Sequence, residues 1–419
     1  MQTAGQGDRS TRTALPDEPR MAESYDAVLI GGGPAGSALA TLLARAGRRV
    51  ALCERDRFPR DKLCGEFLSG ESRRVLGELG CLAELDALRP AAIHACRFTS
   101  SSGAVCGANL PSPALGISRR ALDAVLLRHA ARSGAVVLQG APVCRVEANA
   151  VNGSSPLECR VHLRPQSDAH AVDCLTAGLV VAAHGRRAQL DRELGRKFMR
   201  RAHPYVGLKR HHRPRTGAAG ERLAATLDGF VEVHAFHGGY CGMSFVESGV
   251  VNVCMLVTEA FLADLPSSRW EDVHDGLCRA NPRLAERLAA LEPDEETVHA
   301  VAGIPFSFKE RSSGPVFFVG DAAGMIAPFC GDGQAMALRS ALLLGDLILQ
   351  TPSRLCGEDH RILARRWEAC WRREFGFRMR LGRWLQPLLL RGWTADAALR
   401  LATLAPKIPD WIARATRGA

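Results

Sequence analysis

A glycine-rich turn between a strand and a helix constrains this chain more than any other feature. Residues 31–36 read Gly-Gly-Gly-Pro-Ala-Gly, a G-x-G-x-x-G that follows the apolar run Tyr25–Ile30 and opens a helical stretch, Pro34–Ala46. The next apolar run, Val50–Cys53, leads into Glu54, which stands 18 residues beyond the last glycine. This strand–turn–helix–strand order with a terminal acidic residue is the complete dinucleotide-binding fingerprint.

Each part of the fingerprint has a physical task. Gly31 permits the tight turn, Gly33 lets the backbone approach a diphosphate, and Gly36 lets helix and strand pack closely. The free N–H groups and positive dipole end of the helix N-terminus attract phosphate. Glu54 would accept hydrogen bonds from an adenosine ribose. The contacts expected from this segment are Gly31, Gly33, Pro34, Ala35, Gly36, Ser37, Glu54 and Arg55.

A second glycine-rich segment follows the apolar run Val316–Val319. It begins Gly320-Asp321, reaches a proline at 328, and continues through Gly-Asp-Gly at 331–333 into a helical stretch over 334–344. An acidic residue at the end of a strand can bind a sugar hydroxyl. The N-terminus of the second helix can face an anionic ring edge.

Together these segments resemble the FAD-binding oxidoreductases of the para-hydroxybenzoate hydroxylase fold, which include aromatic monooxygenases, geranylgeranyl reductases and flavin-dependent halogenases. The resemblance covers about residues 22–350 and implies FAD as the cofactor. By it, Asp321 would hold the flavin ribityl chain, Pro328 would lie over the flavin, and Arg119 matches the Arg of an R-x-x-L-D helix start near the FAD. The resemblance adds these residues to the expected FAD site: Arg119, Gly320, Asp321, Pro328, Gly331, Gly333 and Gln334.

Two further segments indicate which branch of this superfamily the chain resembles most. The P-x-x-K-x-C-G stretch that ends in Cys64-Gly65 is similar to segments of the geranylgeranyl-reductase-like branch, where the Cys–Gly turn lies close to the flavin ring. Cys64 is therefore an expected FAD contact and the candidate catalytic residue, with a buried packing thiol as the alternative. His184-Gly185 stands where aromatic hydroxylases carry Asp-Gly, which questions the usual dual contact to FAD and NAD(P)H. A structural turn residue is the alternative for His184.

The substrate side has weaker signals. Tyr240 and Phe245, in a stretch that matches the family's Gly-Tyr strand, together with Ile326 and Phe329, are expected to line an apolar pocket facing the flavin. Taken alone, each of these side chains is more typical of an ordinary core than of a ligand contact. The halogenase W-x-W-x-I-P signature is absent, because no Trp precedes Ile304-Pro305. No Cys/His cluster has metal-ligand spacing.

Length and pattern predict more than one unit, since a single core seldom exceeds about 300 residues and the chain has 419. We expect an α/β protein with a Rossmann-type, GR2-like FAD-binding domain interleaved with a β-rich substrate domain, plus C-terminal helices. The expected ranges are 1–21 for a disordered leader, 22–90, 118–195 and 299–350 for the FAD-binding domain, 91–117 and 196–298 for the substrate domain, and 351–419 for the helices. Met21 is an alternative candidate for the natural start.

Charge and aromatic residues concentrate in the last part of the chain. Net charge is +10, and residues 351–419 hold 14 Lys/Arg against 6 Asp/Glu, with five of the six tryptophans. These helices either cap the substrate domain or make peripheral contact with a membrane. No nucleic-acid motif accompanies the charge, and no apolar run reaches the ~20 residues of a membrane span. The 14 scattered cysteines and the lack of a secretory signal favour the cytoplasm.

The resemblance supports two main functions. The first is a monooxygenase of secondary metabolism that hydroxylates or epoxidises an apolar, aromatic, polyketide-like or prenyl-like molecule through a flavin C4a-hydroperoxide. The second is a C=C reductase or dehydrogenase of the geranylgeranyl-reductase type, which the Cys64 segment favours. A halogenase and a non-catalytic flavin-fold protein are minor alternatives. NAD(P)H is the expected electron donor, with a separate flavin reductase as the alternative because only one dinucleotide fingerprint is present.

Overall fold

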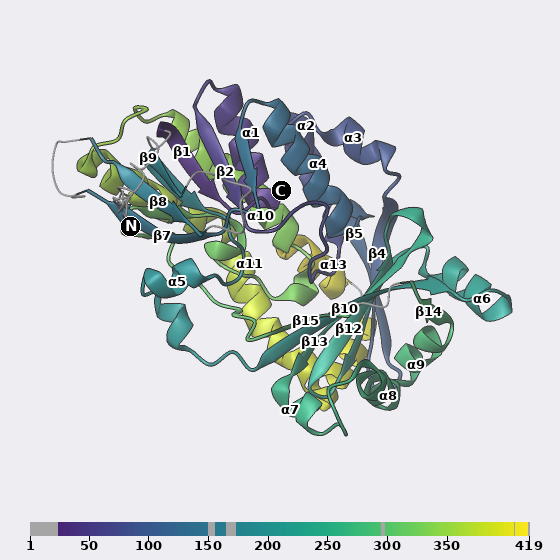
Figure 1. The fold of residues 1–419 in the computed structure, drawn as a ribbon. Coiled ribbons are helices and arrows are strands. Elements are labelled where there is room, and N and C mark those ends of the chain that lie inside the picture. The colour runs from purple at the N-terminus through teal and green to yellow at the C-terminus, as the bar shows by residue number, and fades with distance from the viewer. Residues whose placement is uncertain (1–23, 150–155, 165–172, 295–297, 406, 418–419) are drawn as a thin grey trace, which may run out of the picture.

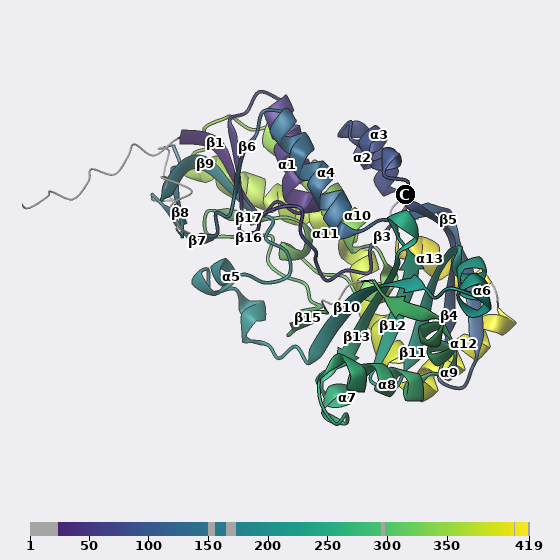
Figure 2. The ribbon, with the colours of Figure 1, turned by 45° about the vertical axis from the view of Figure 1, so that its right-hand side comes forward.

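The chain forms two large sheets joined by helices and crossing loops (Figure 1). The computed structural model describes residues 24–149, 156–164, 173–294, 298–405 and 407–417. The expectation for the leader, residues 1–21, lies outside the described residues. In Figures 1 and 2 the two sheets occupy opposite ends of the molecule, and α10 and α11 run between them.

The first sheet, sheet A, is the expected parallel sheet. Its strands are, in the order in which they pair, β16 (Ser312–Ser313), β17 (Val316–Phe318), β9 (Cys174–Ala182), β1 (Ser24–Ile30), β2 (Val50–Glu54) and β6 (Val136–Gln139), with β7 (Val143–Ala148) and β8 (Cys159–Leu163) attached through β9. The pairs from β17 to β6 are parallel, and Ile30 lies level with Cys53 on one side and Ala182 on the other. The carboxyl ends of β1, β2, β9 and β17 therefore share one edge.

The second sheet, sheet B, is mostly antiparallel. Its strands are, in pairing order, β14 (Leu291–Pro293), β10 (Tyr205–Pro214), β13 (Val251–Thr258), β12 (Gly239–Phe245), β11 (Gly229–Phe236), β4 (Ala91–Thr99), β5 (Val105–Gly116) and β3 (Phe67–Leu68), and β15 (His299–Ala302) also pairs with β10. Only β11 and β4 run parallel. The strands β3 and β15 pair with sheet B although their residues fall in ranges expected for the FAD-binding domain, because both segments cross from one sheet to the other.

Helices cover sheet A and pack on both faces of sheet B. The α-helices are α1 (Pro34–Arg45), α2 (Ser72–Glu78), α3 (Leu82–Ala87), α4 (Arg119–Arg132), α5 (Gln189–Glu193), α6 (Ala218–Leu227), α7 (Glu259–Ala263), α8 (Trp270–Ala280), α9 (Pro282–Ala289), α10 (Gly333–Leu349), α11 (Gly357–Leu390), α12 (Gly392–Leu404) and α13 (Lys407–Ala415). The helices α1, α4 and α10 share one buried core with sheet A, which extends to Trp367 and Trp371 of α11. A second core lies between sheet B and α8 and α9.

One expected helix proves to be two. The amphipathic pattern between Trp270 and Leu291 predicts a single helix, but α8 ends before Asn281 and α9 starts at Pro282. Proline has no N–H for a helix interior and disfavours helical geometry in the residue before it. Asn281 instead caps α9, because its side chain accepts a hydrogen bond from the Leu284 N–H.

Candidate functional site

The expected cofactor motifs meet at the carboxyl edge of sheet A. The glycine turn follows β1, Glu54 ends β2, His184 follows β9, and Asp321 comes soon after β17. Because these four strands are parallel and in register, all four segments leave the sheet on the same side. Ligands of doubly wound α/β sheets bind in a crevice outside this edge.

The glycine turn is closed by contacts that leave no room for side chains. Gly31 has φ of +108°, and a Cβ there would lie 2.6 Å from the Ala183 carbonyl oxygen. A Cβ on Gly36 would lie 1.8 Å from the Gly31 carbonyl oxygen. Gly33, in contrast, has open space apart from the Arg119 guanidinium, 3.6 Å from where its Cβ would be. Gly31 and Gly36 therefore shape the turn, while Gly33 leaves the backbone open to a ligand.

Glu54 holds the turn from the neighbouring strand. Its carboxylate accepts hydrogen bonds from the Gly32 N–H at 2.6 Å and the Asp56 N–H at 2.9 Å. Glu54 and Arg55 both line a hollow of about 820 Å³ beside β1 and β2, together with Gly31 and Gly33. Ser37 does not line it, because its hydroxyl is buried and donates to the Gly32 carbonyl oxygen.

A larger cavity continues from this hollow toward sheet B. It encloses about 1660 Å³ with its open mouth and shares Gly33, Lys62 and Ala183 with the smaller hollow. The two spaces therefore adjoin at the glycine turn, and together we call them the groove. The expected site residues that line the larger cavity are Gly33, Pro34, Ala35, Cys64, Arg119, Tyr240, Gly320, Asp321, Ile326, Pro328, Phe329, Gly331, Gly333 and Gln334.

Lys62 stands at the junction of the two spaces and was not among the expected contacts. Burial, with the nearby Arg119 and Arg60 guanidinium groups, lowers the pKa of Lys62 to about 8. The Asp123 and Glu54 carboxylates oppose this lowering only in part. The adjacent glycine turn is built to bind a diphosphate, whose charge would stabilise the Lys62 ammonium. The K-x-C-G pattern predicted that the segment of Lys62 lies near the cofactor. That Lys62 itself lines both spaces follows only from the fold.

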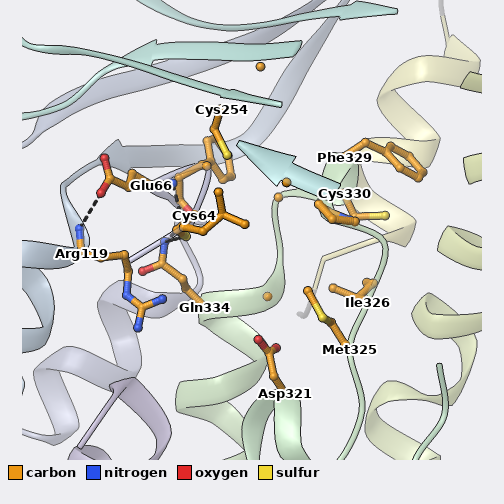
Figure 3. Close-up of a pocket in the computed structure, with 18 of the residues that line it drawn as sticks. Cys64, Glu66, Arg119, Cys254, Asp321, Met325, Ile326, Phe329, Cys330 and Gln334 are labelled. Atoms are coloured by element: carbon orange, nitrogen blue, oxygen red, sulfur yellow. Dashed lines mark hydrogen bonds between the residues drawn. The ribbon is translucent and has the colours of Figure 1, made fainter. Parts of the chain in front are cut away.

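Asp321 lies on the floor of the cavity with its carboxylate turned toward the open space (Figure 3). Behind it, the buried Lys309 ammonium donates to the Arg186 carbonyl oxygen at 2.6 Å and the Asp321 carbonyl oxygen at 2.7 Å. Burial lowers the pKa of Lys309 to about 8, against the opposing effect of Asp321. Lys309 therefore holds the loops of Arg186 and Asp321 together at the cofactor edge. No local sequence motif predicts this role.

The N-terminus of α10 forms another side of the cavity. Gly331 adopts φ of +69° at the end of a short 3-10 turn, and Asp332, which precedes α10, is fully buried. Asp332 accepts from the Arg378 guanidinium at 2.6 Å and the Ser69 hydroxyl at 3.2 Å rather than capping the helix. The first N–H groups of α10 consequently lack a side-chain cap.

Cys64 lies opposite this helix end. The Gln334 amide nitrogen is 3.5 Å from the Cys64 sulfur and 3.2 Å from the Phe67 carbonyl oxygen, so α10 and the Cys64 turn are joined. In Figure 3, Cys64 and Gln334 face Met325, Ile326 and Cys330 across the cavity. The Cys64 thiol is half-buried.

A buried charge network beneath Cys64 joins the two sheets. Glu66 is fully buried with φ of +54°, and its carboxylate accepts from the Lys209 ammonium at 2.5 Å and the Arg119 N–H at 2.9 Å. His211 Nε2 lies 2.6 Å from the other carboxylate oxygen. Lys209 and His211 are two residues apart on β10 and point to one face. These three residues were missed, because Glu66 and its partners lie more than 140 positions apart in sequence.

Arg119 occupies the start of α4 beside the glycine turn. Its guanidinium donates to both carboxylate oxygens of the buried Asp123, at 2.7 and 2.6 Å. Burial alone would lower the pKa of Arg119, but Asp123 reverses this effect and raises it. Arg119 therefore stays charged at the edge of the cavity and contributes positive potential near Gly33.

The substrate wall follows the two-residue period of sheet B. Tyr240, Gly242, Met243 and Ser244 of β12 line the cavity, whereas Cys241 and Phe245 pack into the core under the opposite face. The expectation that Phe245 lines the pocket is therefore corrected by strand register, since side chains alternate between faces. Apart from Arg417, the rest of this wall is apolar. It is built from Phe98, Val231, Val233, Leu256, Ile304, Met325, Ile326 and Phe329.

His184 belongs to a separate buried network. Its Nε2 lies 3.0 Å from Asp191, which also accepts from Arg196 at 2.7 Å. Burial lowers the pKa of His184, although Asp191 opposes this. Despite burial, the His184 and Arg196 contacts lower the pKa of Asp191 to about 2. His184 borders the smaller hollow, while Gly185 and Arg186 border the larger cavity.

The groove fits FAD. Two helix N-termini without side-chain caps, a carboxylate at each end, and a lysine and an arginine beside the diphosphate turn are complementary to a flavin dinucleotide. The buried Oε1 of Gln334 has no hydrogen-bond partner in the described chain and is thus free for a ligand. Fold and site together define a flavoprotein with its FAD-binding crevice facing a second, apolar wall.

Comparison with known proteins agrees with this class. Residues 24–220 match the family described as an FAD binding domain. Menaquinone reductase of Mycobacterium tuberculosis is 28% identical over 425 aligned positions, which cover 94% of this chain and 95% of that protein. Residues 24–220 therefore carry an FAD-binding domain, and the chain is similar over most of its length to FAD-dependent oxidoreductases.

Solved structures share the fold. A geranylgeranyl bacteriochlorophyll reductase-like protein from Thermoplasma acidophilum superposes with a TM-score of 0.69 at 19% identity, covering 90% of this chain and 91% of that one. The myxobacterial chondrochloren halogenase gives a TM-score of 0.68 at 21% identity, with 84% and 80% coverage. Within the described residues, no cluster of three or more His, Cys, Asp or Glu is arranged to bind a metal.

Proposed function

We propose that this chain is an FAD-dependent reductase that saturates a C=C bond of an apolar, prenylated substrate, with menaquinone-like lipids as the first candidates. The observation that carries this proposal is the wall opposite the cofactor edge, which is mostly apolar and has the Tyr240 and Ser244 hydroxyls and Arg417 as its polar groups. Such a surface suits a hydrocarbon chain and offers little to a polar aromatic substrate. The full-length similarity to menaquinone reductases supports the same class.

Residues of the chain provide binding, orientation and a proton. The glycine turn, α1 and Lys62 would hold the diphosphate, Asp321 the ribityl chain, and the α10 N-terminus the flavin ring edge. FAD, once reduced, supplies a hydride. Saturation of C=C also needs a proton on the second carbon, and the half-buried Cys64 sulfur is the donor we assign. Burial raises the pKa of the Cys254 and Cys330 thiols far above their usual values, which makes them poorer donors.

The electron donor follows from the single dinucleotide fingerprint. NAD(P)H would visit the open cavity transiently, or a separate flavin reductase would pass electrons to the FAD. Bleaching of the visible flavin band by NADH or NADPH, without another protein, is the expected result for direct reduction. A flavin that stays oxidised until a flavin reductase is added supports the alternative.

Oxygenation, the other main function that the resemblance supports, is the second candidate. The observation in its favour is the same apolar wall, because an oxygenating flavin must be shielded from water. Strictly anaerobic turnover separates the two. Reduction predicts a product two hydrogens heavier, formed without O₂ by flavin reduced with dithionite. A product that gains one oxygen and forms only in air contradicts the reductase proposal.

Variants at Cys64 test the assigned proton donor. We expect Cys64→Ala to lower kcat for C=C saturation by about 10²–10⁴, and Cys64→Ser to lower it less. Flavin reduction should be unchanged in both. Cys370→Ser, at a half-buried thiol of α11 outside the cavity, is the matched control. Unchanged kcat in Cys64→Ala removes Cys64 from the mechanism.

A further inference from the structure

Exposed apolar side chains gather on the C-terminal helices. Of the eleven large hydrophobic residues that are exposed in the described chain, eight lie between positions 377 and 411. Trp384 is 83% exposed, Leu404 82% and Trp393 73%, which are unusual values for such side chains. The eight residues are Phe377, Trp384, Leu388, Trp393, Leu401, Leu404, Ile408 and Trp411.

These side chains follow helical spacing on α11, α12 and α13. Trp384 and Leu388 are four residues apart on α11, Trp393 and Leu404 eleven apart on α12, and Ile408 and Trp411 three apart on α13. Each set therefore lies on one side of its helix. The opposite sides are buried, through residues such as Leu389, Leu390, Ala395, Leu399 and Ala413. We call the exposed set, together with the cations described next, the C-terminal face.

The charges on this face have one sign. The exposed charged residues between 377 and 414 are all basic: Arg380, Arg383, Arg391, Arg400, Lys407 and Arg414. The two acidic residues of the same stretch are half-exposed and bond to residues of the β4–β5 hairpin. Asp396 accepts from the Ser102 hydroxyl at 2.8 Å, and Asp410 accepts from the Asn109 N–H of β5 at 3.0 Å. Arg400 is near enough to Asp396 to help to lower the pKa of that carboxyl.

We propose that the C-terminal face docks on the surface of an anionic lipid bilayer. Exposed tryptophans favour the membrane–water interface, where the ring is apolar and its N–H stays hydrated. Exposed basic residues are attracted to the negative surface of such a bilayer. No described helix is both long and apolar enough to cross a membrane. Docking would therefore be peripheral, with amphipathic helices lying in the interface.

The same helices lead inward to the cavity. Leu390, at the end of α11, packs with Tyr240 and Ile304 of the cavity wall, and Phe329 contacts the cluster that contains Leu389 and Ala395. Arg417, just beyond α13, lines the cavity. The yellow C-terminal helices run along sheet B in Figures 1 and 2. Docking would bring the cavity close to lipid, from which an apolar substrate could enter it. This role in substrate entry rests on the proposed function, whereas the docking itself does not.

Liposome co-sedimentation of the full chain tests the docking. The protein should pellet with vesicles of phosphatidylcholine and phosphatidylglycerol, much less with phosphatidylcholine alone, and less as salt increases. Trp393→Ala/Trp411→Ala and Arg383→Glu/Arg391→Glu should each weaken partitioning about tenfold or more. The matched controls are Leu88→Ala/Ile362→Ala and Arg222→Glu/Arg279→Glu, at exposed positions elsewhere, which should bind like the parent.

Three outcomes would overturn the docking proposal. The first is that the parent protein pellets with neither kind of vesicle. The second is that the control variants lose as much vesicle binding as the variants of the C-terminal face. The third is that the parent binds no lipid and sediments as a dimer, which Trp393→Ala/Trp411→Ala dissociates. Turnover of a short-chain, detergent-free quinone tests the proposed function separately. Turnover without vesicle binding rejects only the docking, and vesicle binding without turnover rejects only the reductase.

Discussion

The two walls of the cavity are specified by different means. The cofactor wall is made mostly of backbone: Gly31 and Gly36 leave no space for a Cβ, and helix N-termini present free N–H groups. The substrate wall is made of alternating side chains on sheet B, and Val233 or Leu256 could be exchanged for other apolar residues. A backbone-built wall tolerates little change and serves one ligand, whereas a side-chain wall can be retuned. Substitutions on the cofactor wall should therefore reduce stability and ligand binding more than substitutions on the substrate wall.

The largest effect is expected at Gly36. In Gly36→Ala the Cβ would lie 1.8 Å from the Gly31 carbonyl oxygen, so the turn or the helix must move. We expect a loss of at least about 3 kcal/mol in the free energy of unfolding, the upper end of ordinary overpacking, and loss of bound FAD. Thermal unfolding and flavin content of the purified protein measure both. Gly77→Ala, inside α2 with open space around it, is the control and should be neutral.

A slightly smaller effect is expected where the two walls join. Lys209→Met removes one partner from the fully buried Glu66 carboxylate, so about 3–5 kcal/mol should be lost. Denaturant unfolding of Lys209→Met, Glu66→Gln and the double variant measures this, and the double variant should recover part of the loss. Arg213→Met, on the same strand but in an exposed pair with Asp294, should cost less than about 1 kcal/mol. Equal losses of unfolding free energy in Lys209→Met and Arg213→Met would mean that the buried network stabilises the fold no more than an exposed ion pair does.

The contrast between the walls also explains what the sequence could predict. The glycine turn, Glu54 and the Asp321 segment are local patterns whose chemistry depends on residues a few positions apart, so their convergence on one edge was predictable. Glu66, Lys209 and His211 meet only through the pairing of β10 in sheet B, and strand register is not written in any one segment. Phe245 was misplaced for the same reason.

Not every miss was long-range. The break between α8 and α9 was signalled locally by Asn281-Pro282, a helix cap followed by a proline, and the amphipathic pattern alone outweighed that signal. Lys62 was placed in the right segment, but its position between the hollow and the cavity depends on how the whole segment crosses from sheet A to sheet B.

Lys62 should make FAD affinity depend on pH. In the protein without ligand its pKa is about 8, and a bound diphosphate would raise it. Below pH 8 the ammonium is already charged and affinity should be flat. Above pH 8 binding must take up a proton, so affinity should fall by up to tenfold per pH unit. Fluorescence titration of the apoprotein with FAD measures the slope. In Lys62→Met, FAD affinity should be low at every pH and should no longer depend on pH. Lys197→Met, at an exposed lysine, is the control and should keep the pH dependence.

The smallest effect on stability is expected on the substrate wall, at Tyr240. Burial raises the pKa of this phenol well above its usual value, against the opposing effect of the Phe329 backbone. Tyr240→Phe removes a buried polar group without leaving another one unpaired, so the free energy of unfolding should change by less than about 1 kcal/mol or increase. FAD affinity should be unchanged.

The same variant shows what the hydroxyl does for the substrate. If Tyr240 binds a polar group such as a quinone carbonyl at the end of an otherwise apolar molecule, Tyr240→Phe should raise KM for that substrate about tenfold, the value of one hydrogen bond of roughly 1.5 kcal/mol. KM for a purely hydrocarbon prenyl substrate should stay the same. A hydroxyl that serves neither would leave both KM values unchanged, and the substrate wall would then select by shape alone. Phe98→Leu, at an apolar position of that wall, should alter both KM values together and so separates packing from hydrogen bonding.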